Sequence, residues 1–198
     1  MKSLEQQIEE VKKVPGNVKG EAIKTIIPYI KKRKGEEGLK KVLKEANKFG
    51  VLIDLEEIKP LRMYPGYMPM VIILIAKDIF NWSDDDIFEM GYYSLRISFL
   101  IKFVITKIIS VETIFKNAPN YWKKHYDFGE FIPLELNKKE KYMIVATKGD
   151  DFHPLLCRFH AGYFKSLLML VVNSDDVHIE ETKCVHRGDE HHEYKLTW

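Results

Sequence analysis

The sequence of 198 residues has little glutamine and cysteine, and it has no unbroken apolar run long enough to cross a membrane. Glutamine occurs only twice, whereas lysine, glutamate and isoleucine are abundant, a balance that indicates a thermophilic source. The longest apolar stretch, residues 91–110, is interrupted by Arg96, Lys102 and Lys107. A spanning helix needs about 20 nearly unbroken apolar residues. We therefore expect no membrane span, and we interpret this stretch as a buried helix.

Two cysteines are too few for a disulfide framework, and the first residues do not have the pattern of a secretory signal peptide. Both observations lead us to expect a cytoplasmic protein. Basic and acidic residues number 31 and 29, which leaves a formal charge of +2 and no electrostatic basis for binding nucleic acid. The sequence also has no glycine-rich nucleotide fingerprint and no signature of an ATPase, a kinase or a DNA-binding output domain.

The order of the periodic segments predicts an α+β fold. Apolar residues recur at helical spacing in several stretches before residue 128. Two alternating segments, 128–136 and 141–149, are typical of a β-hairpin, and a long apolar helix followed by two more strands closes the chain. We therefore expect an antiparallel sheet of two hairpins packed against several helices. Residues 18–198 would form a single domain, preceded by a helical extension over residues 1–17.

The stretch from Cys157 to Trp198 gathers the residue types that bind metal ions, since it holds both cysteines and five of the seven histidines. Cys157 lies on the apolar face of a predicted helix, which directs it toward the final strands. Strand alternation places Glu181 and His192 on inward faces. Zinc takes thiolate, imidazole and carboxylate ligands. The pattern therefore predicts a zinc site made by Cys157, Glu181, Cys184 and His192.

The position of Cys184 needs a local irregularity for this site to form. It has the wrong parity for a regular strand, so a β-bulge or the start of a turn must bring it inward. A buried cysteine in a helix is also common as a packing residue. The spacing E-x-x-C-x7-H is not one of the common zinc-finger patterns.

At these residues the sequence resembles the 4-vinyl reductase domain family. That family is similar in fold to phenol-sensing domains of bacterial activators, to haem-NO-binding proteins and to TRAPP-type transport subunits. The resemblance rests on Cys157 followed by HAGYFKSLL at 160–168, on Glu181-x-x-Cys184, and on the glycine-aspartate turn that follows. In the aromatic sensors the analogous positions hold zinc through Cys, Glu, Cys and Cys. Here His192 stands at the fourth place, with His191 or His186 as alternatives.

The resemblance also implies that a small hydrophobic or aromatic ligand binds between the helices and the sheet. Mixed aromatic and methionine side chains suit such a pocket. The candidate lining consists of Tyr67, Met68, Phe88, Tyr92, Phe99, Phe103, Trp122 and Phe164. A haem is not expected, because a haem needs an axial ligand and the only histidine before residue 150 is His125, beside two charged lysines.

Together these features predict a small-molecule-binding sensory or carrier domain, in which a structural zinc fixes the last helix to the final hairpin. One alternative is a metal-dependent or reductase-type enzyme, as the family name implies, with Glu181 as the base beside a catalytic zinc. The other is a dimeric scaffold like the transport subunits. A homodimer is compatible with all three functions.

Overall fold

The structure, a computed structural model, describes residues 2–98 and 110–198. The helices are α1 Leu4–Val11, α2 Gly20–Lys48, α3 Tyr67–Phe80, α4 Asp84–Ile97, α6 Val111–His125 and α7 Pro154–Val172. The strands are β1 Asn17–Lys19, β2 Met63–Pro65, β3 Glu130–Asn137, β4 Tyr142–Lys148, β5 His178–Lys183 and β6 His192–Thr197, with a 3-10 turn, η1, at Val185–Arg187. The predicted α+β fold with an antiparallel sheet and packed helices is therefore confirmed.

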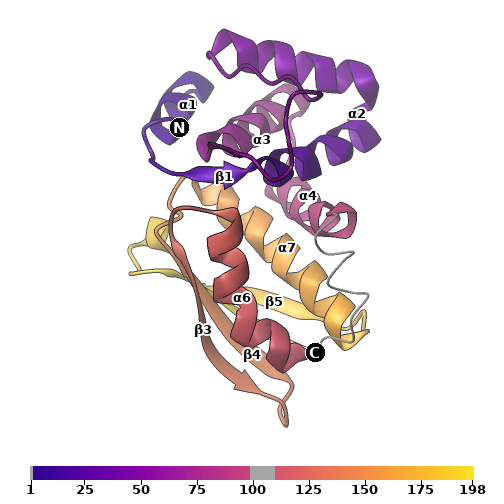
Figure 1. The fold of residues 1–198 in the computed structure, drawn as a ribbon, viewed down its shortest axis with the longest axis vertical. Helices are drawn as coiled ribbons and strands as arrows, with labels where there is room; N and C mark the ends of the chain where they lie inside the picture. Colours follow the sequence, from indigo (N-terminus) through magenta and orange to yellow (C-terminus); the bar gives the residue numbers. More distant parts are fainter. Residues whose placement is uncertain (1, 99–109) are drawn as a thin grey trace.

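The helices α1, α2 and α3 form one end of the molecule, and the sheet with α6 and α7 forms the other (Figure 1). The helix α3 is the centre of the first part, because every residue from Met70 to Ala76 is buried. The short helix α1 adds Ile8 and Val11, both fully buried, to the same core. Whether residues 1–17 form an extension of a domain over 18–198 stays a prediction.

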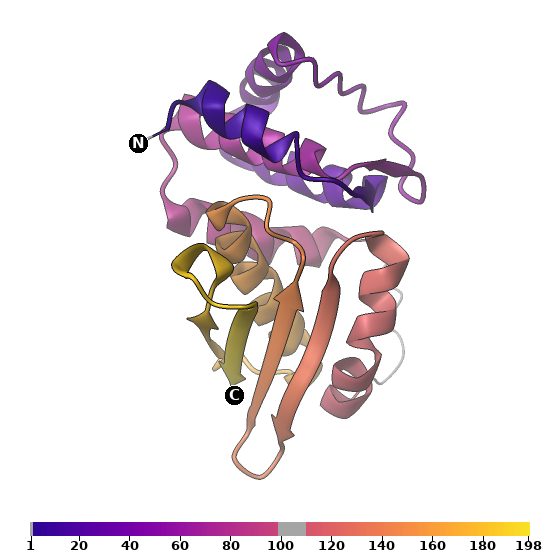
Figure 2. The ribbon, with the colours of Figure 1, turned by 90° about the vertical axis from the view of Figure 1, so that its left-hand side faces the viewer.

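The four-stranded sheet has the order β3-β4-β6-β5, and all neighbouring strands are antiparallel (Figure 2). The two predicted hairpins are therefore joined through β4 and β6, with Val145 opposite Tyr194. The helix α7 packs on one face of this sheet, where Phe164 and Leu168 join Tyr194 and Leu196 in a second hydrophobic cluster. Cys157 and His160 lie on α7, and His192 lies on β6.

The helices α4 and α7 cross at unusually close range because a glycine of each faces the backbone of the other. A Cβ at Gly162 would clash with the carbonyl oxygen of Phe88, and one at Gly91 would clash with that of Phe159. The close partner of Gly162 is therefore α4 and not the sheet. This crossing sets the position of α7 and of every site residue that it carries.

Several local features of the structure go beyond the predicted order of elements. Pro28 and Pro119 lie inside α2 and α6 without dividing them, and the non-helical backbone inside α2 is at Gly35, with a φ of 68°. The strands β1 and β2 pair in a small sheet that periodicity did not indicate. The helix α4 begins after Ser83 and includes the first residues of the buried helix expected over 91–110, and residues 99–109 of that stretch lie outside the described residues.

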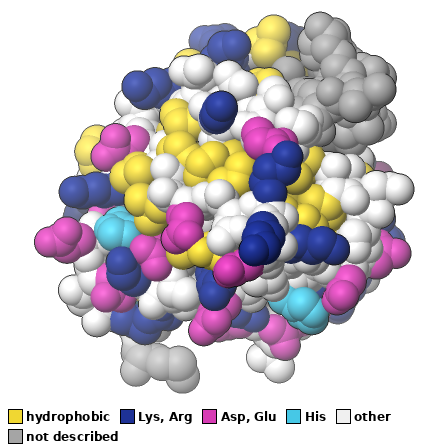
Figure 3. Space-filling model, turned by 90° about the horizontal axis from the view of Figure 1, so that it is seen from below, with side chains coloured by type: hydrophobic (Ala, Val, Ile, Leu, Met, Phe, Trp, Pro, Cys, Tyr) yellow, Lys and Arg dark blue, Asp and Glu magenta, His cyan; other side chains and the backbone are white. Residues whose placement is uncertain are grey.

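Seen from below, the surface has hydrophobic side chains gathered near its middle, with charged side chains around them (Figure 3). Within the described residues, one helix, α7, is long and apolar enough to meet the length and composition of a membrane span. Half of that window is buried inside the protein, and the core helix of a soluble protein meets the same criteria. Localisation and the expected homodimer stay predictions.

Candidate functional site

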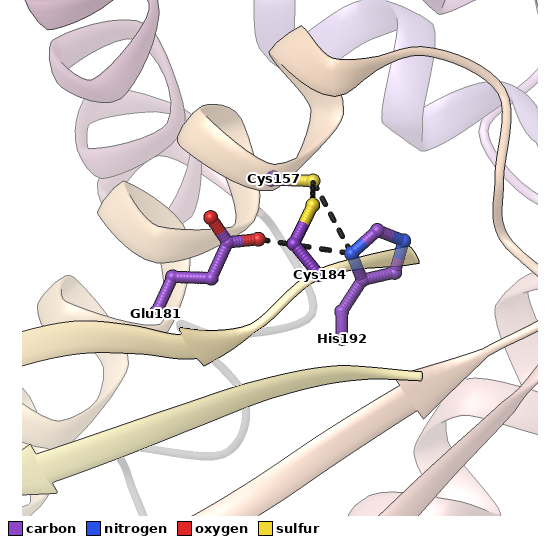
Figure 4. A group of neighbouring side chains, drawn as sticks. All are labelled: Cys157, Glu181, Cys184 and His192. Atoms are coloured by element: carbon purple, nitrogen blue, oxygen red, sulfur yellow. Dashed lines mark hydrogen bonds and ion pairs between the residues drawn. The ribbon is translucent and has the colours of Figure 1, made fainter. Parts of the chain in front are cut away.

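The structure brings together the four side chains predicted to bind a metal, Cys157, Glu181, Cys184 and His192 (Figure 4). One ligand atom from each lies within 4.8 Å of the others. The two sulfur atoms are 3.7 Å apart, and Sγ of Cys157 lies 3.3 Å from Nδ1 of His192. Oε1 of Glu181 lies 3.7 Å from the same nitrogen. We call these four residues the Cys–Glu–Cys–His cluster.

These separations match the edges of a coordination tetrahedron. Bonds of about 2.3 Å to sulfur and about 2.1 Å to nitrogen or oxygen place two sulfurs roughly 3.8 Å apart. The same bonds give about 3.6 Å between sulfur and nitrogen. The distances in the cluster fall within a few tenths of an ångström of these values. Two thiolates, an imidazole and a carboxylate are a donor set for a first-row transition-metal ion.

Local backbone features, namely a helix start, a β-bulge and a turn, position the ligands of the cluster. Helix α7 begins after His153, whose Nδ1 accepts a hydrogen bond from the Leu155 backbone N–H, and Pro154 fits its first turn. Strand register shifts between Glu181 and Lys183, so the bulge predicted near Cys184 is confirmed. The turn η1 ends at Gly188, with a φ of 99°.

Charged groups around the cluster hold its ligands in place. Oδ1 of Asp151 lies 3.5 Å from Nε2 of His192, on the side of the ring away from the cluster. A carboxylate behind an imidazole is the usual support of a metal-binding histidine. Arg187 donates a hydrogen bond to Oε2 of Glu181 at 3.0 Å, which leaves Oε1 directed at the cluster. Asp189 accepts a hydrogen bond from the backbone N–H of Cys184.

Burial and neighbouring polar groups shift the pKa values of three residues in the cluster. Burial, followed by the charge of Glu181, raises the pKa of the Cys157 thiol. Burial acts to raise the pKa of Glu181, but the polar groups of His192 and the two cysteines close to it lower the pKa to about 2. Burial acts to lower the pKa of His192, yet the neighbouring Glu181 carboxylate raises it overall. A cation would offset the negative charge that this carboxylate brings into the protein.

The alternative histidines occupy different places. His192 is buried, with 2 % of its side chain exposed, and belongs to the cluster. The side chain of His191 contacts Glu193 instead. The ring of His186 lies 5.5 Å from the ring of His192, between ring centres, and outside the four-residue group. The identity of the fourth ligand is thus indicated by geometry, while metal binding itself stays a prediction.

A cavity of about 570 Å³ lies beside the cluster, and we call it the central cavity. Its walls come from the N-terminal part of α2, from α3, α6 and α7, and from strands β3, β4 and β6. Most of the lining is apolar, as in the side chains of Ile73, Phe115 and Leu168. A volume of this size falls in the range of about 300–1,000 Å³ that holds small organic ligands and cofactors.

A histidine–aspartate pair forms the most buried polar part of this lining. Nδ1 of His160 lies 3.4 Å from Oδ2 of Asp150, and the two side chains are 8 % and 2 % exposed. Burial acts to raise the pKa of Asp150, but the hydrogen bond with His160 lowers it overall, so the carboxylate is ionised. The ring of His160 stacks on Phe164 and meets the edge of Trp122.

Two tyrosines add hydroxyl groups to the same cavity. Tyr126 and Tyr163 both line it. Burial and then the charge of Asp150 raise the pKa of Tyr126 to about 12. Burial also raises the pKa of Tyr163. Both hydroxyls therefore stay protonated at neutral pH and can donate hydrogen bonds to an occupant.

The predicted pocket residues fall into three groups. Trp122 and Phe164 line the central cavity, whereas four others lie outside its described lining. Those four are Tyr67, Met68, Phe88 and Tyr92. Phe99 and Phe103 lie outside the described residues. Whether any of these eight residues contacts a ligand stays a prediction.

Comparison with known proteins gives a match in fold only. No family model matches the sequence, and no curated protein matches it. An H-NOX protein from S. oneidensis in the Fe(II)NO ligation state has a TM-score of 0.68 and 12 % identity, with 90 % of this chain and 97 % of that chain covered. An oxygen-binding H-NOX domain related to soluble guanylate cyclases has a TM-score of 0.64 and 11 % identity, with coverage of 90 % and 94 %.

A third structure, solved to probe heme distortion in the H-NOX family, has a TM-score of 0.65 and 10 % identity, and the alignment covers 91 % of this chain and 94 % of that chain. At such identity the likeness shows the fold, which was predicted as that of haem-NO-binding proteins. The comparisons do not show the 4-vinyl reductase family. They also contradict the expectation of zinc as the cofactor without haem, because heme is named for the structures of this fold.

The sequence interpretation assigned no role to a buried histidine in the lining of the central cavity, His160. It considered His125 as exposed, but this residue is half-buried and lines the central cavity. It named His160 only as part of the segment 160–168, although this residue follows Cys157 by three residues and precedes Phe164 by four. Residues at steps of three and four share one face of a helix. Because Cys157 had been placed on the apolar face and Phe164 in the pocket lining, this spacing could have identified His160 as buried.

Proposed function

We propose that this chain is a ligand-binding domain with a sensory or carrier role, and that its ligand is a small, largely apolar molecule held in the central cavity. The observation that supports this most directly is the cavity itself, with its volume of about 570 Å³ and its largely apolar lining. Burial of apolar ligand surface would supply most of the binding free energy, at about 25 cal/mol per Å². The comparisons give no support to the two alternatives, an enzyme and a dimeric scaffold.

Haem is the first occupant to test, because the structural neighbours are haem proteins. The residues present fit it in two respects. His160 offers a buried imidazole in the lining, with Asp150 behind it, which is the support that iron-binding histidines commonly have. Lys19 and Lys124 also line the cavity and offer positive charge to carboxylate groups. A bound haem would supply an iron atom for gaseous ligands of the kind named for the neighbours.

The test is a titration of the purified protein with hemin and, separately, with an apolar fluorescent dye. We expect saturable binding of one molecule per chain and an increase in melting temperature with ligand concentration. A protein that takes up neither compound and whose melting temperature is unchanged by both would contradict the proposed function.

We further propose that the Cys–Glu–Cys–His cluster binds a transition-metal ion that joins α7 to the strands β5 and β6. The support is the tetrahedral spacing of the four ligand atoms, together with the contact of Asp151 with His192 and the hydrogen bond from Arg187 to Glu181. Such an ion would fix the start of α7, and with it one wall of the central cavity.

Cobalt(II) is a suitable probe for this cluster, because tetrahedral thiolate coordination gives strong visible and near-ultraviolet absorption. We expect one cobalt ion per chain with these bands, and elemental analysis of the protein as purified would identify the resident ion. The variant His191→Ala is the matched control, since His191 contacts Glu193 and lies outside the cluster. Loss of the bands in that control, or their absence in the wild type, would contradict the proposal.

A further inference from the structure

The pair His160–Asp150 is placed to select what binds in the central cavity. Oδ2 of the Asp150 carboxylate lies 3.4 Å from Nδ1 of His160, and this negative oxygen favours the tautomer that carries its proton on Nδ1. In the neutral ring this leaves Nε2 as an acceptor whose lone pair points away from Asp150. Within residues 2–98 and 110–198 no hydrogen-bond partner contacts Nε2, although the ring lines the cavity.

The surroundings keep this ring in one orientation. Phe164 stacks on it with ring centres 5.5 Å apart, and Trp122 meets its edge at 5.7 Å. Asp150 is held in a buried position, where its other oxygen, Oδ1, has no hydrogen-bond partner among the described residues. The imidazole therefore cannot rotate to exchange its nitrogens without breaking the contact that stabilises the carboxylate.

We propose that His160 is the specificity-determining residue of the central cavity, and that its Nε2 requires an occupant with one electron-pair acceptor on an otherwise apolar body. This inference rests on the proposed function of the cavity. Two sources offer that chemistry, the iron of a haem and the hydroxyl proton of an apolar alcohol or phenol. Asp150 acts as the positioning residue, because it fixes the tautomer of His160 and does not itself meet the occupant.

The alternative ring in the lining does not have these properties. Nδ1 of His125 contacts the backbone carbonyl oxygen of Tyr121 at 2.7 Å, within its own helix. No carboxylate lies within ion-pair distance of His125 among the described residues. His178, on β5, lies outside the described lining of the cavity, and 78 % of its side chain is exposed. His178→Phe is therefore the matched control for His160→Phe, since it makes the same replacement of an imidazole by an apolar ring away from the cavity.

The hydroxyl source is tested with a pair of ligands of nearly equal shape, 1-naphthol and naphthalene. We expect the wild type and His178→Phe to bind 1-naphthol roughly 10-fold more tightly than naphthalene, because a buried acceptor without a partner is costly. In His160→Phe the preference should fall to about 1-fold while naphthalene binding persists. Persistence of naphthalene binding also shows that the variant has folded.

The iron source is tested with hemin in the same proteins. Here we expect the Soret band of the wild type and of His178→Phe to report imidazole ligation, and His160→Ala to lose that signature and regain it when free imidazole is added. Asp150→Asn should keep the ligation but shift the reduction potential of the iron, a change that a purely structural role would not produce.

Each outcome decides one of the two proposals. A naphthol preference or an imidazole–haem spectrum that depends on His160 supports the inference and identifies the source. Binding of naphthalene, naphthol and hemin that is unchanged in His160→Phe overturns the inference but leaves the proposed function standing. If none of the three compounds binds to the wild type, the proposed function itself fails.

Discussion

The Cys–Glu–Cys–His cluster and the central cavity lie side by side but are built in different ways. The cluster takes four polar side chains from a stretch of 36 residues, Cys157 to His192, and packs them at separations below 4.8 Å. The cavity takes its lining from segments between Val18 and Leu196, almost the whole chain. The cluster therefore depends on short distances within one segment of the chain, whereas the cavity depends on the packing of helices from the whole chain.

Helix α7 links the two regions, because Cys157 points into the cluster and His160, one turn later, lines the cavity. Asp150 and Asp151, adjacent residues before α7, also contact one region each. Asp150 contacts His160, and Asp151 contacts His192. A change in the position of α7 should therefore affect both regions, while changes at single side chains should separate them.

The largest effect is expected from Gly162→Val, which places a branched side chain where α4 and α7 cross. The new Cβ would clash with the carbonyl oxygen of Phe88, and backbone cannot move aside as a flexible side chain can. We expect the free energy of unfolding to fall by about 3 kcal/mol or more, with loss of both metal and ligand binding. Urea denaturation measures this, and Lys165→Ala on the same helix should change stability by less than about 0.5 kcal/mol.

The next largest effect is expected from Cys184→Ala, which removes one ligand of the cluster and leaves the cavity lining intact. Metal content should fall from one ion per chain to near zero. At a metal concentration of roughly 100 times Kd, the variant should lack about 3 kcal/mol of stabilisation that the wild type gains. Melting curves with and without a chelator measure the difference. A variant that retains its metal would show that Cys184 is a packing residue.

A smaller effect, confined to the cavity, is expected from Ala118→Phe. Ala118 lines the central cavity from α6, so a phenyl ring would occupy space that the ligand needs. Affinity for naphthalene or hemin should fall by roughly 10-fold or more, which is about 1.4 kcal/mol. Metal content should not change. Equal affinity in the variant and the wild type would place the binding site elsewhere.

The smallest effect is expected from pH, through His153 at the start of α7. Burial, and then repulsion from His186, lowers the pKa of His153 from 6.5 to about 4. The unfolded chain therefore binds more protons between pH 6.5 and 4, so the free energy of unfolding falls as the pH falls through that range. His153→Asn replaces the capping ring nitrogen by a capping amide oxygen and does not titrate. Its stability should decline less over this range, by about 1 kcal/mol after allowance for solvent screening.

Much of the cluster could be predicted from the sequence because strand and helix periods are fixed by backbone geometry. Alternation in the last strand put His192 on the same face as Tyr194 and Leu196, and all three are buried. The bulge needed for Cys184 was inferred from parity alone and is present beside Glu181. Residues within one turn or one hairpin are neighbours whatever the rest of the chain does.

The cavity could not be predicted in the same way. Aromatic residues at helical spacing, such as Phe88 and Tyr92, are equally suited to a packed helix interface and to a cavity wall. Their helix α4 meets α7 through Gly91 and Gly162, which uses that face for backbone contact. The sequence determined the order of elements and the local ligand geometry. Tertiary packing decided which apolar faces close on each other and which leave space, because packing depends on contacts between residues far apart in the chain.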